Sequence, residues 1–164
     1  PAENLVGAEG QGFKNAMGVL NLNRPTVSAA SVGIAQGALD AAMAYAKDRV
    51  QFGQPIANFQ LVQAMLADMA IQIEAARALL YKVTAFIDRD PTHPKVPMYS
   101  SMIKTFASDM AMKVTTDAVQ VFGGAGYLQD HPVERYMRDA KVCQIYEGTN
   151  QIQRLIIARA MLKD

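Results

Sequence analysis

The sequence predicts an all-α fold, an up-and-down four-helix bundle with an additional short helix. Apolar residues recur at alternating steps of four and three from Val62 to Ile87, as on one face of a long helix. Proline and glycine gather in "FGQPIANFQ" and "RDPTHPKVP", which separate long segments without proline. No segment shows the strict alternation or the β-branched density of a strand. Long helices joined by such short breaks pack as antiparallel neighbours.

The first long helix is expected to begin at "NRP", residues 23–25. Pro25 would then occupy the first helical position, where its missing N–H costs little. Residues 1–12, with three glycines and one proline, are expected to form an extended entry segment, and Gly12 to Leu22 could form a short helix. The chain is thus divided into a leading segment, residues 1–22, and a helical bundle, residues 23–164.

The second and third helices follow from their apolar patterns. The heptad-like seam of the second comprises Val62, Leu66, Met69, Ile73, Ala76, Leu80, Val83 and Ile87. The third is expected from about Met98 to Val121, with inward side chains at Ile103, Phe106, Met110, Val114 and Val121. The glycines of "FGGAGY" are expected to terminate it, because glycine is the preferred residue just after a helix.

Two shorter helices complete the prediction. One begins after Pro132, and the last runs from about Asn150 to Leu162. Asn150 and Gln153 have the spacing of a capping box, so Asn150 is expected to cap this last helix.

Composition narrows the class of protein. The chain has 164 residues, enough for one domain with a substantial core, and 51% of them are apolar, which indicates a globular fold. The 16 basic and 15 acidic residues leave a net charge of +1, without the basic block of a nucleic-acid-binding protein. No uninterrupted apolar run is long enough to cross a bilayer. No nucleic-acid partner and no membrane span are therefore expected.

The remaining composition features concern cysteine, histidine and the chain start. The single cysteine, Cys143, excludes an internal disulfide; it is either a small buried core residue or a reactive thiol. His93 and His131 are isolated, so no metal site is expected. The chain opens on Pro1 without an initiator methionine or a secretory signal, and we expect it to be part of a longer protein.

Three polar clusters lie at predicted helix ends. In "DRVQFGQP", Arg49 either complements the dipole at the end of the first helix or offers a planar guanidinium to a phosphate, with Phe52 as a ring for a base. In "QVFGGAG", residues 120–126, the glycines either terminate a helix or let a ligand approach the backbone. This pattern follows a helix, so it is not a dinucleotide-binding fingerprint.

The third cluster is "YEGTNQ", residues 146–151. Glu147 is either an ordinary acidic residue that complements a helix dipole or a general base in a partly apolar pocket. Tyr146 could line such a pocket, and Gly148 would let a substrate come close to the backbone. The spacing of these residues alone leaves both interpretations open.

In order along the chain, these stretches resemble the C-terminal helical domain of the acyl-CoA dehydrogenase family. The resemblance covers essentially the whole chain and rests on the motifs R-x-x-F-G, Q-x-F-G-G-x-G and D-A-x-x-x-x-I-Y-E-G-T-N-Q-I-Q-R. It implies an enzyme of fatty-acid β-oxidation that converts an acyl-CoA thioester to the trans-2-enoyl-CoA with FAD as cofactor. It also implies that residues 1–22 are the junction from a β-domain outside this chain.

The resemblance implies that Glu147 is the base that removes the α-proton while a hydride leaves the β-carbon for flavin N5. A minority of the family, such as the isovaleryl and long-chain enzymes, carry the base near the position of residues 21–23. This sequence has Asn21, Leu22 and Asn23 there and no acid, which favours Glu147.

Further roles are implied by matched position. The expected FAD contacts are Arg49, Phe52, Gln60, Gln120, Gly123, Gly124, Thr149 and Gln151, the first three toward a neighbouring subunit. The expected substrate contacts are Asn21, Arg24, Tyr146 and Gly148. Asn21 stands where many relatives have aspartate, which leaves the preferred acyl chain open.

The resemblance also implies partners. The full enzyme is expected to be a homotetramer, to pass electrons to electron-transferring flavoprotein, and to reside in the bacterial cytoplasm or the mitochondrial matrix. The isolated chain is expected to be inactive, because much of the flavin site lies in the β-domain. Two alternatives remain: a non-catalytic oligomerisation module of the same fold, and an acyl-CoA oxidase.

Overall fold

The computed structural model describes residues 1–163 as an all-α bundle, which confirms the predicted fold class. Its helices are α1 (Gly12–Asp48), α2 (Gln60–Arg89), α3 (Val96–Phe122), α4 (Val133–Cys143) and α5 (Asn150–Met161). A hairpin of two-residue strands, β1 (Val50–Gln51) and β2 (Gln54–Pro55), joins α1 to α2. Single 3-10 turns occupy Ala2–Asn4, Ile56–Asn58 and Gly123–Tyr127.

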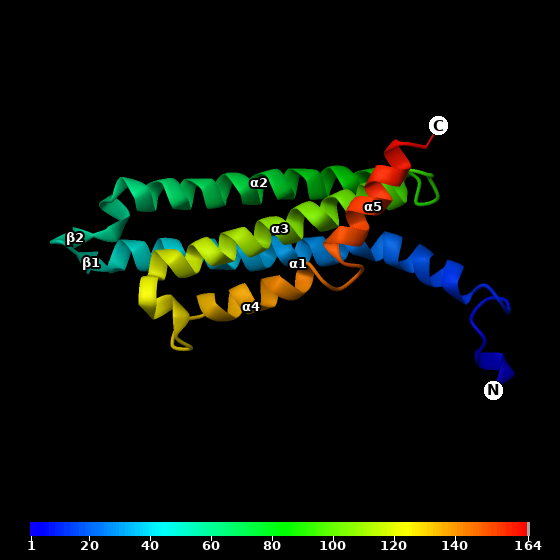
Figure 1. The fold of residues 1–164 in the computed structure, drawn as a ribbon, viewed down its shortest axis with the longest axis horizontal. Coiled ribbons are helices and arrows are strands. Elements are labelled where there is room, and N and C mark those ends of the chain that lie inside the picture. The colour runs from blue at the N-terminus through cyan, green and yellow to red at the C-terminus, as the bar shows by residue number, and fades with distance from the viewer. Residues whose placement is uncertain (164) are drawn as a thin grey trace.

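The first four helices run alternately up and down (Figure 1). The three long helices α1, α2 and α3 pack against one another, and the shorter α4 returns along α1 and α3. The helix α5 crosses α3 at the end of the bundle opposite the hairpin (Figure 1). The loop between α4 and α5 therefore lies at this end.

The expected start of the first long helix at residues 23–25 is wrong. The helix α1 begins at Gly12 and continues through Pro25, which is buried inside it. A proline within a helix removes one backbone hydrogen bond and usually kinks or ends the helix, which is why the sequence favoured a boundary here. The continuous helix crosses the predicted boundary between residues 22 and 23, and the assignment of residues 1–22 to a junction stays a prediction.

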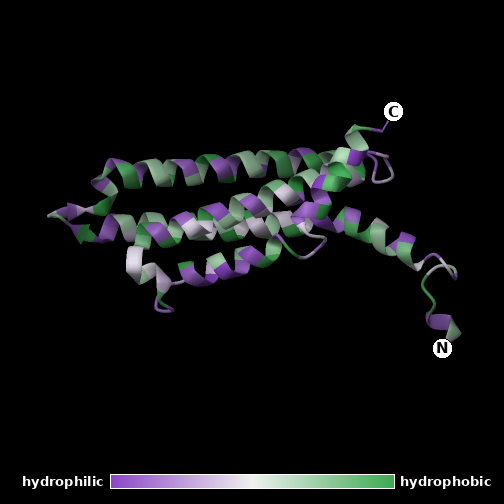
Figure 2. Cartoon of the chain, in the orientation of Figure 1, coloured by the Kyte–Doolittle hydropathy of each residue, from purple (hydrophilic) through white to green (hydrophobic). Residues whose placement is uncertain are grey.

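The core lies between α1, α2, α3 and α4. Figure 2 shows that hydrophobic and hydrophilic residues alternate along α2, as expected for a helix with one buried face. The predicted seam of α2 is confirmed: its five middle members are buried, and Val62, Leu66 and Ile87 are partly buried against the core. Alanines allow close contact between α1 and α3, since Ala35, Ala38, Ala42, Ala107 and Ala111 are all fully buried.

One inward position predicted for α3 is wrong, because Phe106 is 42% exposed. Successive helical residues lie about 100° apart around the axis, so Phe106 falls outside the buried face that contains Ala107 and Ala111. The other four predicted positions are buried. Cys143 is also buried, which confirms it as a core residue of α4.

The hairpin after α1 was not predicted. Phe52 and Gly53 form its tip with φ values of 52° and 79°, as two-residue hairpin turns require at both central positions. The Phe52 side chain is 93% exposed. Two-residue strands are too short to produce an alternating pattern, so no strand could be predicted here.

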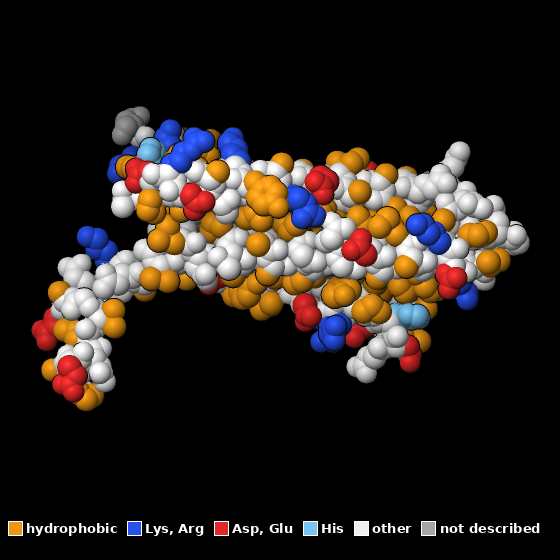
Figure 3. Space-filling model, turned by 180° about the vertical axis from the view of Figure 1, so that it is seen from behind, with side chains coloured by type: hydrophobic (Ala, Val, Ile, Leu, Met, Phe, Trp, Pro, Cys, Tyr) orange, Lys and Arg blue, Asp and Glu red, His pale blue; other side chains and the backbone are white. Residues whose placement is uncertain are grey.

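The first turns of α1 stand clear of the bundle (Figure 3). Residues 12–19 are all exposed, among them the large apolar side chains of Phe13, Met17 and Val19. By length and composition alone α1 is apolar enough to cross a bilayer, but core helices of bundles meet the same criterion. The expectation of no membrane span therefore stays a prediction. The later part of α1 is such a core helix.

Candidate functional site

The site is built around the loop that joins α4 to α5, residues 144–149. This loop contacts the first third of α1, at Asn23 and Arg24, and the first half of α3, at Lys104. Glu147 has a φ of 57° and Gly148 a φ of 90°, so two successive residues adopt the left-handed conformation. This conformation is unfavourable for a glutamate and persists only where surrounding contacts hold it.

The Glu147 carboxylate has two different oxygens. Oε1 accepts a hydrogen bond from Nδ2 of Asn23 at 2.9 Å. Oε2 is buried and has no hydrogen-bond partner within residues 1–163. A buried oxygen with a free lone pair is unusual in a folded protein and is suited to accept a proton from a bound molecule.

The main-chain oxygens of the loop face a set of donors from three elements. Arg24 Nε of α1 donates to Glu147 O at 3.2 Å, and Lys104 Nζ of α3 donates to Gly148 O at 2.9 Å. Gln153 Nε2 of α5 donates to both oxygens, at 3.2 and 3.1 Å. A Cβ on Gly148 would lie 2.5 Å from that nitrogen and would displace it, and the φ of 90° favours glycine at this position.

Two of these donors are buried cations. Arg24 is 3% exposed and Lys104 is 1% exposed. Burial lowers the pKa of the Arg24 guanidinium, and the neighbouring Glu147 partly offsets this effect. Burial, followed by the charge of Arg24, lowers the pKa of Lys104 to about 8. Both side chains remain charged at neutral pH, which places positive charge beside the loop.

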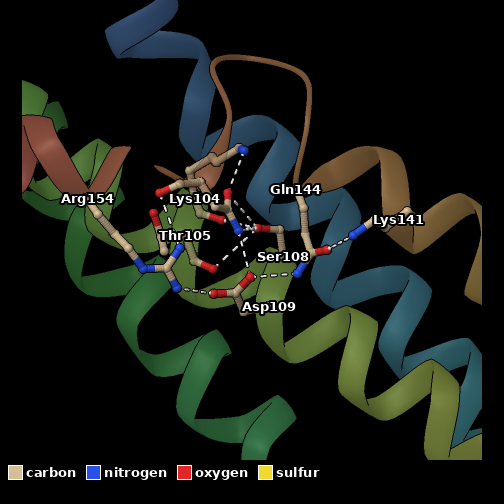
Figure 4. A network of polar contacts seen from close by, with 8 residues as sticks. Lys104, Thr105, Ser108, Asp109, Lys141, Gln144 and Arg154 are labelled. Atoms are coloured by element: carbon tan, nitrogen blue, oxygen red, sulfur yellow. Dashed lines mark hydrogen bonds and ion pairs between the residues drawn. The ribbon is translucent and has the colours of Figure 1, made fainter. Parts of the chain in front are cut away.

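A polar network behind the loop joins α3, α4 and α5 (Figure 4). Asn150 Oδ1 accepts from Lys104 Nζ at 2.7 Å, and its Nδ2 donates to Asp109 Oδ1 at 2.7 Å. Asp109 also accepts from Gln144 at 2.7 Å and forms an ion pair with Arg154 at 2.6 Å. Burial raises the pKa of Asp109, but the hydrogen bonds from Arg154, Gln144 and Asn150 outweigh it and bring this pKa below its usual value.

The predicted cap of α5 is wrong. Thr149 is the N-cap residue, and its Oγ1 accepts from the N–H of Ile152 at 3.5 Å. Asn150 is the first helical residue, and its side chain is used by the buried network instead. Sequence spacing suggested Asn150 because asparagine is itself a favoured cap residue.

Of the residues predicted to contact substrate, three lie together with Glu147. Arg24 Nη1 donates to Asn21 Oδ1 at 2.7 Å, and Gly148 adjoins both Arg24 and Glu147. The Tyr146 hydroxyl lies 3.3 Å from Cys143 Sγ, directed toward α4. Burial, with the Cys143 contact, raises the pKa of Tyr146 to about 12, so its hydroxyl stays protonated.

The residues predicted to contact FAD fall into two groups far apart along the bundle, one near the hairpin and one beside the middle of α3. Arg49, Gly123 and Gly124 line one depression of about 440 Å³ near the hairpin. Gln120 and Gln60 are exposed near the same end, as is Phe52. Thr149 and Gln151 line a separate depression of about 280 Å³ beside Asp109. Arg24, beside Glu147, and Arg49, beside the first depression, are separated by roughly 38 Å along α1, at about 1.5 Å per residue.

Three residues that hold the loop were missed in the sequence: Asn23 as a donor, Lys104 and Gln153. A signal for Lys104 was present. It lies in the series Ser100, Lys104, Ala107, Ala111, Val114 and Ala118, whose other members are all buried. A lysine at a seam position of a buried helix indicates a buried cation that needs partners.

These features define the class of protein: a helical bundle whose carboxylate site lies between α1, α3 and the loop before α5. The chain belongs to the acyl-CoA dehydrogenase family, since residues 10–162 match the model described as "Acyl-CoA dehydrogenase, C-terminal domain".

Individual relatives belong to the same family. The chain is 58% identical over 163 residues to "Probable acyl-CoA dehydrogenase FadE25" of Mycobacterium tuberculosis, covering 99% of this chain and 41% of that protein. It matches the solved butyryl-CoA dehydrogenase of Megasphaera elsdenii with a TM-score of 0.92 and 50% identity, covering 99% and 42% of the two chains. A Bacillus anthracis acyl-CoA dehydrogenase complexed with FAD matches with a TM-score of 0.93 and 32% identity, covering 99% and 31%. The chain thus spans about two fifths of its curated relatives.

Proposed function

We propose that this chain is the C-terminal domain of an FAD-dependent acyl-CoA dehydrogenase in which Glu147 is the α-proton base. The enzyme converts an acyl-CoA thioester to the trans-2-enoyl-CoA. The observation that carries this proposal is Oε2 of Glu147, a buried carboxylate oxygen without a hydrogen-bond partner among the described residues. The family membership supplies the class of reaction that needs such an oxygen.

The contacts of Glu147 suit proton removal from carbon. An α-proton beside a thioester is weakly acidic, so a base must be positioned and largely withdrawn from water. Asn23 holds Oε1, which leaves Oε2 to receive the proton. Arg24 holds the Glu147 carbonyl at the same point, and Gly148 adopts without strain the left-handed backbone that follows the base.

The residues near the hairpin fit a phosphate-containing cofactor. Gly123 and Gly124 have open space where a side chain would lie, so a ligand can approach the backbone, and the nearby Arg49 offers a guanidinium for phosphate. FAD, when bound, supplies the acceptor for the hydride that leaves the β-carbon. We propose that Arg49, Phe52, Gln60, Gln120, Gly123 and Gly124 contact the FAD of a neighbouring subunit, and that Thr149 and Gln151 contact the FAD of their own.

The separation of these two groups supports an oligomer. Because the two groups lie in separate depressions far apart along one bundle, each FAD site would draw residues from two copies of the chain, as in a homotetramer. The proposal includes electron-transferring flavoprotein as the electron acceptor and a location in the bacterial cytoplasm or mitochondrial matrix. It also predicts little or no activity for the 164-residue chain alone.

The variant Glu147→Gln in the full-length enzyme tests the base. Glutamine keeps the size and the hydrogen bond to Asn23 but cannot accept the proton, so turnover should fall at least about 1,000-fold while FAD remains bound. Glu134→Gln, which alters an exposed ion pair of α4, is the matched control and should retain turnover. A Glu147→Gln enzyme within about tenfold of wild type would show that another group is the base.

A further inference from the structure

Lys104 is a buried lysine whose hydrogen-bond partners are all neutral. Its Nζ contacts Gly148 O and Asn150 Oδ1, and it forms no ion pair within residues 1–163. Burying an ammonium without a counter-ion is costly, and an apolar side chain would fill the core at lower cost. The two contacts both lie in the segment that follows Glu147, which points to a role in shaping that segment.

We propose that Lys104 is a positioning residue for Glu147: it holds the Gly148 carbonyl and Asn150, and thereby fixes the left-handed backbone that directs the Glu147 carboxylate. This inference rests on the proposed function of Glu147 as the base. Lys104 itself does not touch the substrate. It acts from inside the bundle, through the backbone of the loop.

The geometry of the peptide unit explains how hydrogen bonds to the Glu147 and Gly148 carbonyls orient the backbone of the loop. Each trans peptide is planar, so its C=O and N–H point in opposite directions. Lys104 and Gln153 draw the Gly148 carbonyl toward the bundle, which turns the N–H of Thr149 to the opposite side. Arg24 and Gln153 draw the Glu147 carbonyl inward, which turns the N–H of Gly148 outward in the same way.

The other side of Glu147 is fixed as well. The N–H of Tyr146 donates to Val142 O at 3.0 Å, which ties the preceding residue to the end of α4. The φ and ψ of Glu147 are therefore set from both sides, and its left-handed conformation is maintained by Lys104, Arg24 and Gln153. Loss of the Lys104 contact leaves Gly148 O with Gln153 alone and leaves Asn150 Oδ1 without the ammonium.

The ionisation of Lys104 should make turnover depend on pH. A purely structural role of Lys104 would not change this pH dependence. Burial and the charge of Arg24 lower the pKa of Lys104 to about 8, while Cys143, Asp109 and Glu147 act to raise it. On α5, Arg154 is paired with Asp109. Above this pKa the amine is neutral and has one fewer N–H, so its hold on the loop weakens. Turnover should therefore decline as the pH rises through about 8.

The test compares Lys104→Met with wild type in the full-length holoenzyme. Methionine has a similar length but no charge and no donor. Turnover should fall about 100-fold while KM and bound FAD remain near wild type, because the base is displaced rather than removed. The decline near pH 8 should also disappear. Hydrogen exchange should become faster at the Asn150 amide, which donates to Gln144 O at 3.0 Å across the loop. Lys113→Met, an exposed change on the same helix, should alter none of these.

Lys104→Arg is the second variant and covers the case in which Lys104→Met does not fold. Arginine keeps its charge at all accessible pH values, so this enzyme should lack the decline near pH 8 and exceed Lys104→Met in turnover. The inference is overturned if Lys104→Met stays within threefold of wild type, or if Lys104→Arg retains the decline. Glu147→Gln, measured in the same assay, separates this inference from the proposed function. If Glu147→Gln is inactive, either of these two Lys104 results refutes only the positioning role of Lys104. If Glu147→Gln is active, the proposed function of Glu147 as the base is refuted.

Discussion

Nδ2 of Asn23 lies 2.9 Å from Oε1 of Glu147, although 124 positions separate these residues in the chain. One belongs to α1 and the other to the loop before α5. Residues 21–23 contain no acid, which favours Glu147 as the base. The structure adds that the asparagine at this place donates a hydrogen bond to the same carboxylate.

We predict that Asn23→Ala lowers turnover of the full-length enzyme roughly tenfold, because Oε1 loses its donor and the carboxylate can rotate. Steady-state kinetics with an acyl-CoA substrate measures this. Asn58→Ala, which alters an exposed asparagine near the hairpin, should leave turnover unchanged. Equal turnover in the two variants would show that Asn23 does not orient the base.

We predict that Arg49→Ala reduces the FAD content of the purified enzyme, because the depression beside Gly123 and Gly124 loses its cation for phosphate. The ratio of flavin absorbance to protein measures the content directly. Lys47→Ala removes another cation from the last turn of α1 and controls for the helix-dipole effect. Full FAD content in Arg49→Ala would exclude the phosphate role.

We predict that Asp109→Asn lowers the free energy of unfolding by about 1 kcal/mol at pH 7, a value kept small because over a third of this side chain is exposed. The folded-state pKa of Asp109 lies below its unfolded value near 3.9, so its stabilisation is fully present at neutral pH and is lost as the pH falls below about 4. Urea unfolding at pH 7 and at pH 3 measures both effects.

The difference between wild type and Asp109→Asn should therefore shrink at pH 3. Glu74→Gln serves as the control, because its ion pair with Arg77 lies on the surface of α2 and should contribute little at either pH. A difference of the same size at both pH values would mean that the Asp109 charge does not stabilise the fold.

We predict that Ile73→Ala destabilises the protein by about 2–5 kcal/mol, because it leaves a cavity in the seam of α2. Ile71 lies on the same helix and is 66% exposed, so Ile71→Ala should cost less than 1 kcal/mol, about the size of an ordinary surface change. Chemical denaturation of the two variants gives the comparison. Similar losses would contradict the buried placement of the seam.

The helices α2 and α3 could be predicted from the sequence because the patterns that indicate them are local. The seam of α2 and the glycine that terminates α3 each lie within one element, and both are confirmed. The start of α1 was misread because Pro25 is a strong local stop signal, which tertiary packing overrides in this helix. The turn at Phe52 was not predicted, because non-glycine residues rarely adopt the positive φ that Phe52 has here.

The site was predictable only in part. The resemblance to the acyl-CoA dehydrogenase family identified Glu147 and Arg24 as candidate site residues. In the fold, Arg24 Nε donates to Glu147 O, so the two residues are in contact. The hold on the loop depends on contacts between residues far apart in sequence, such as Lys104 with Gly148, 44 positions away. A buried lysine on the inner face of α3 was visible as a pattern, but its partners are defined only once α5 is placed across that helix.

The uninterrupted length of α1 has a consequence for evolution of this domain. The same helix contains Arg24, which contacts Glu147, and ends at Arg49. Inserting or deleting a single residue between them would rotate one end relative to the other by about 100° and shift it by about 1.5 Å. Homologous proteins can therefore exchange side chains along this span, but gaps in it should be excluded, and alignments of the family can be anchored on its fixed spacing.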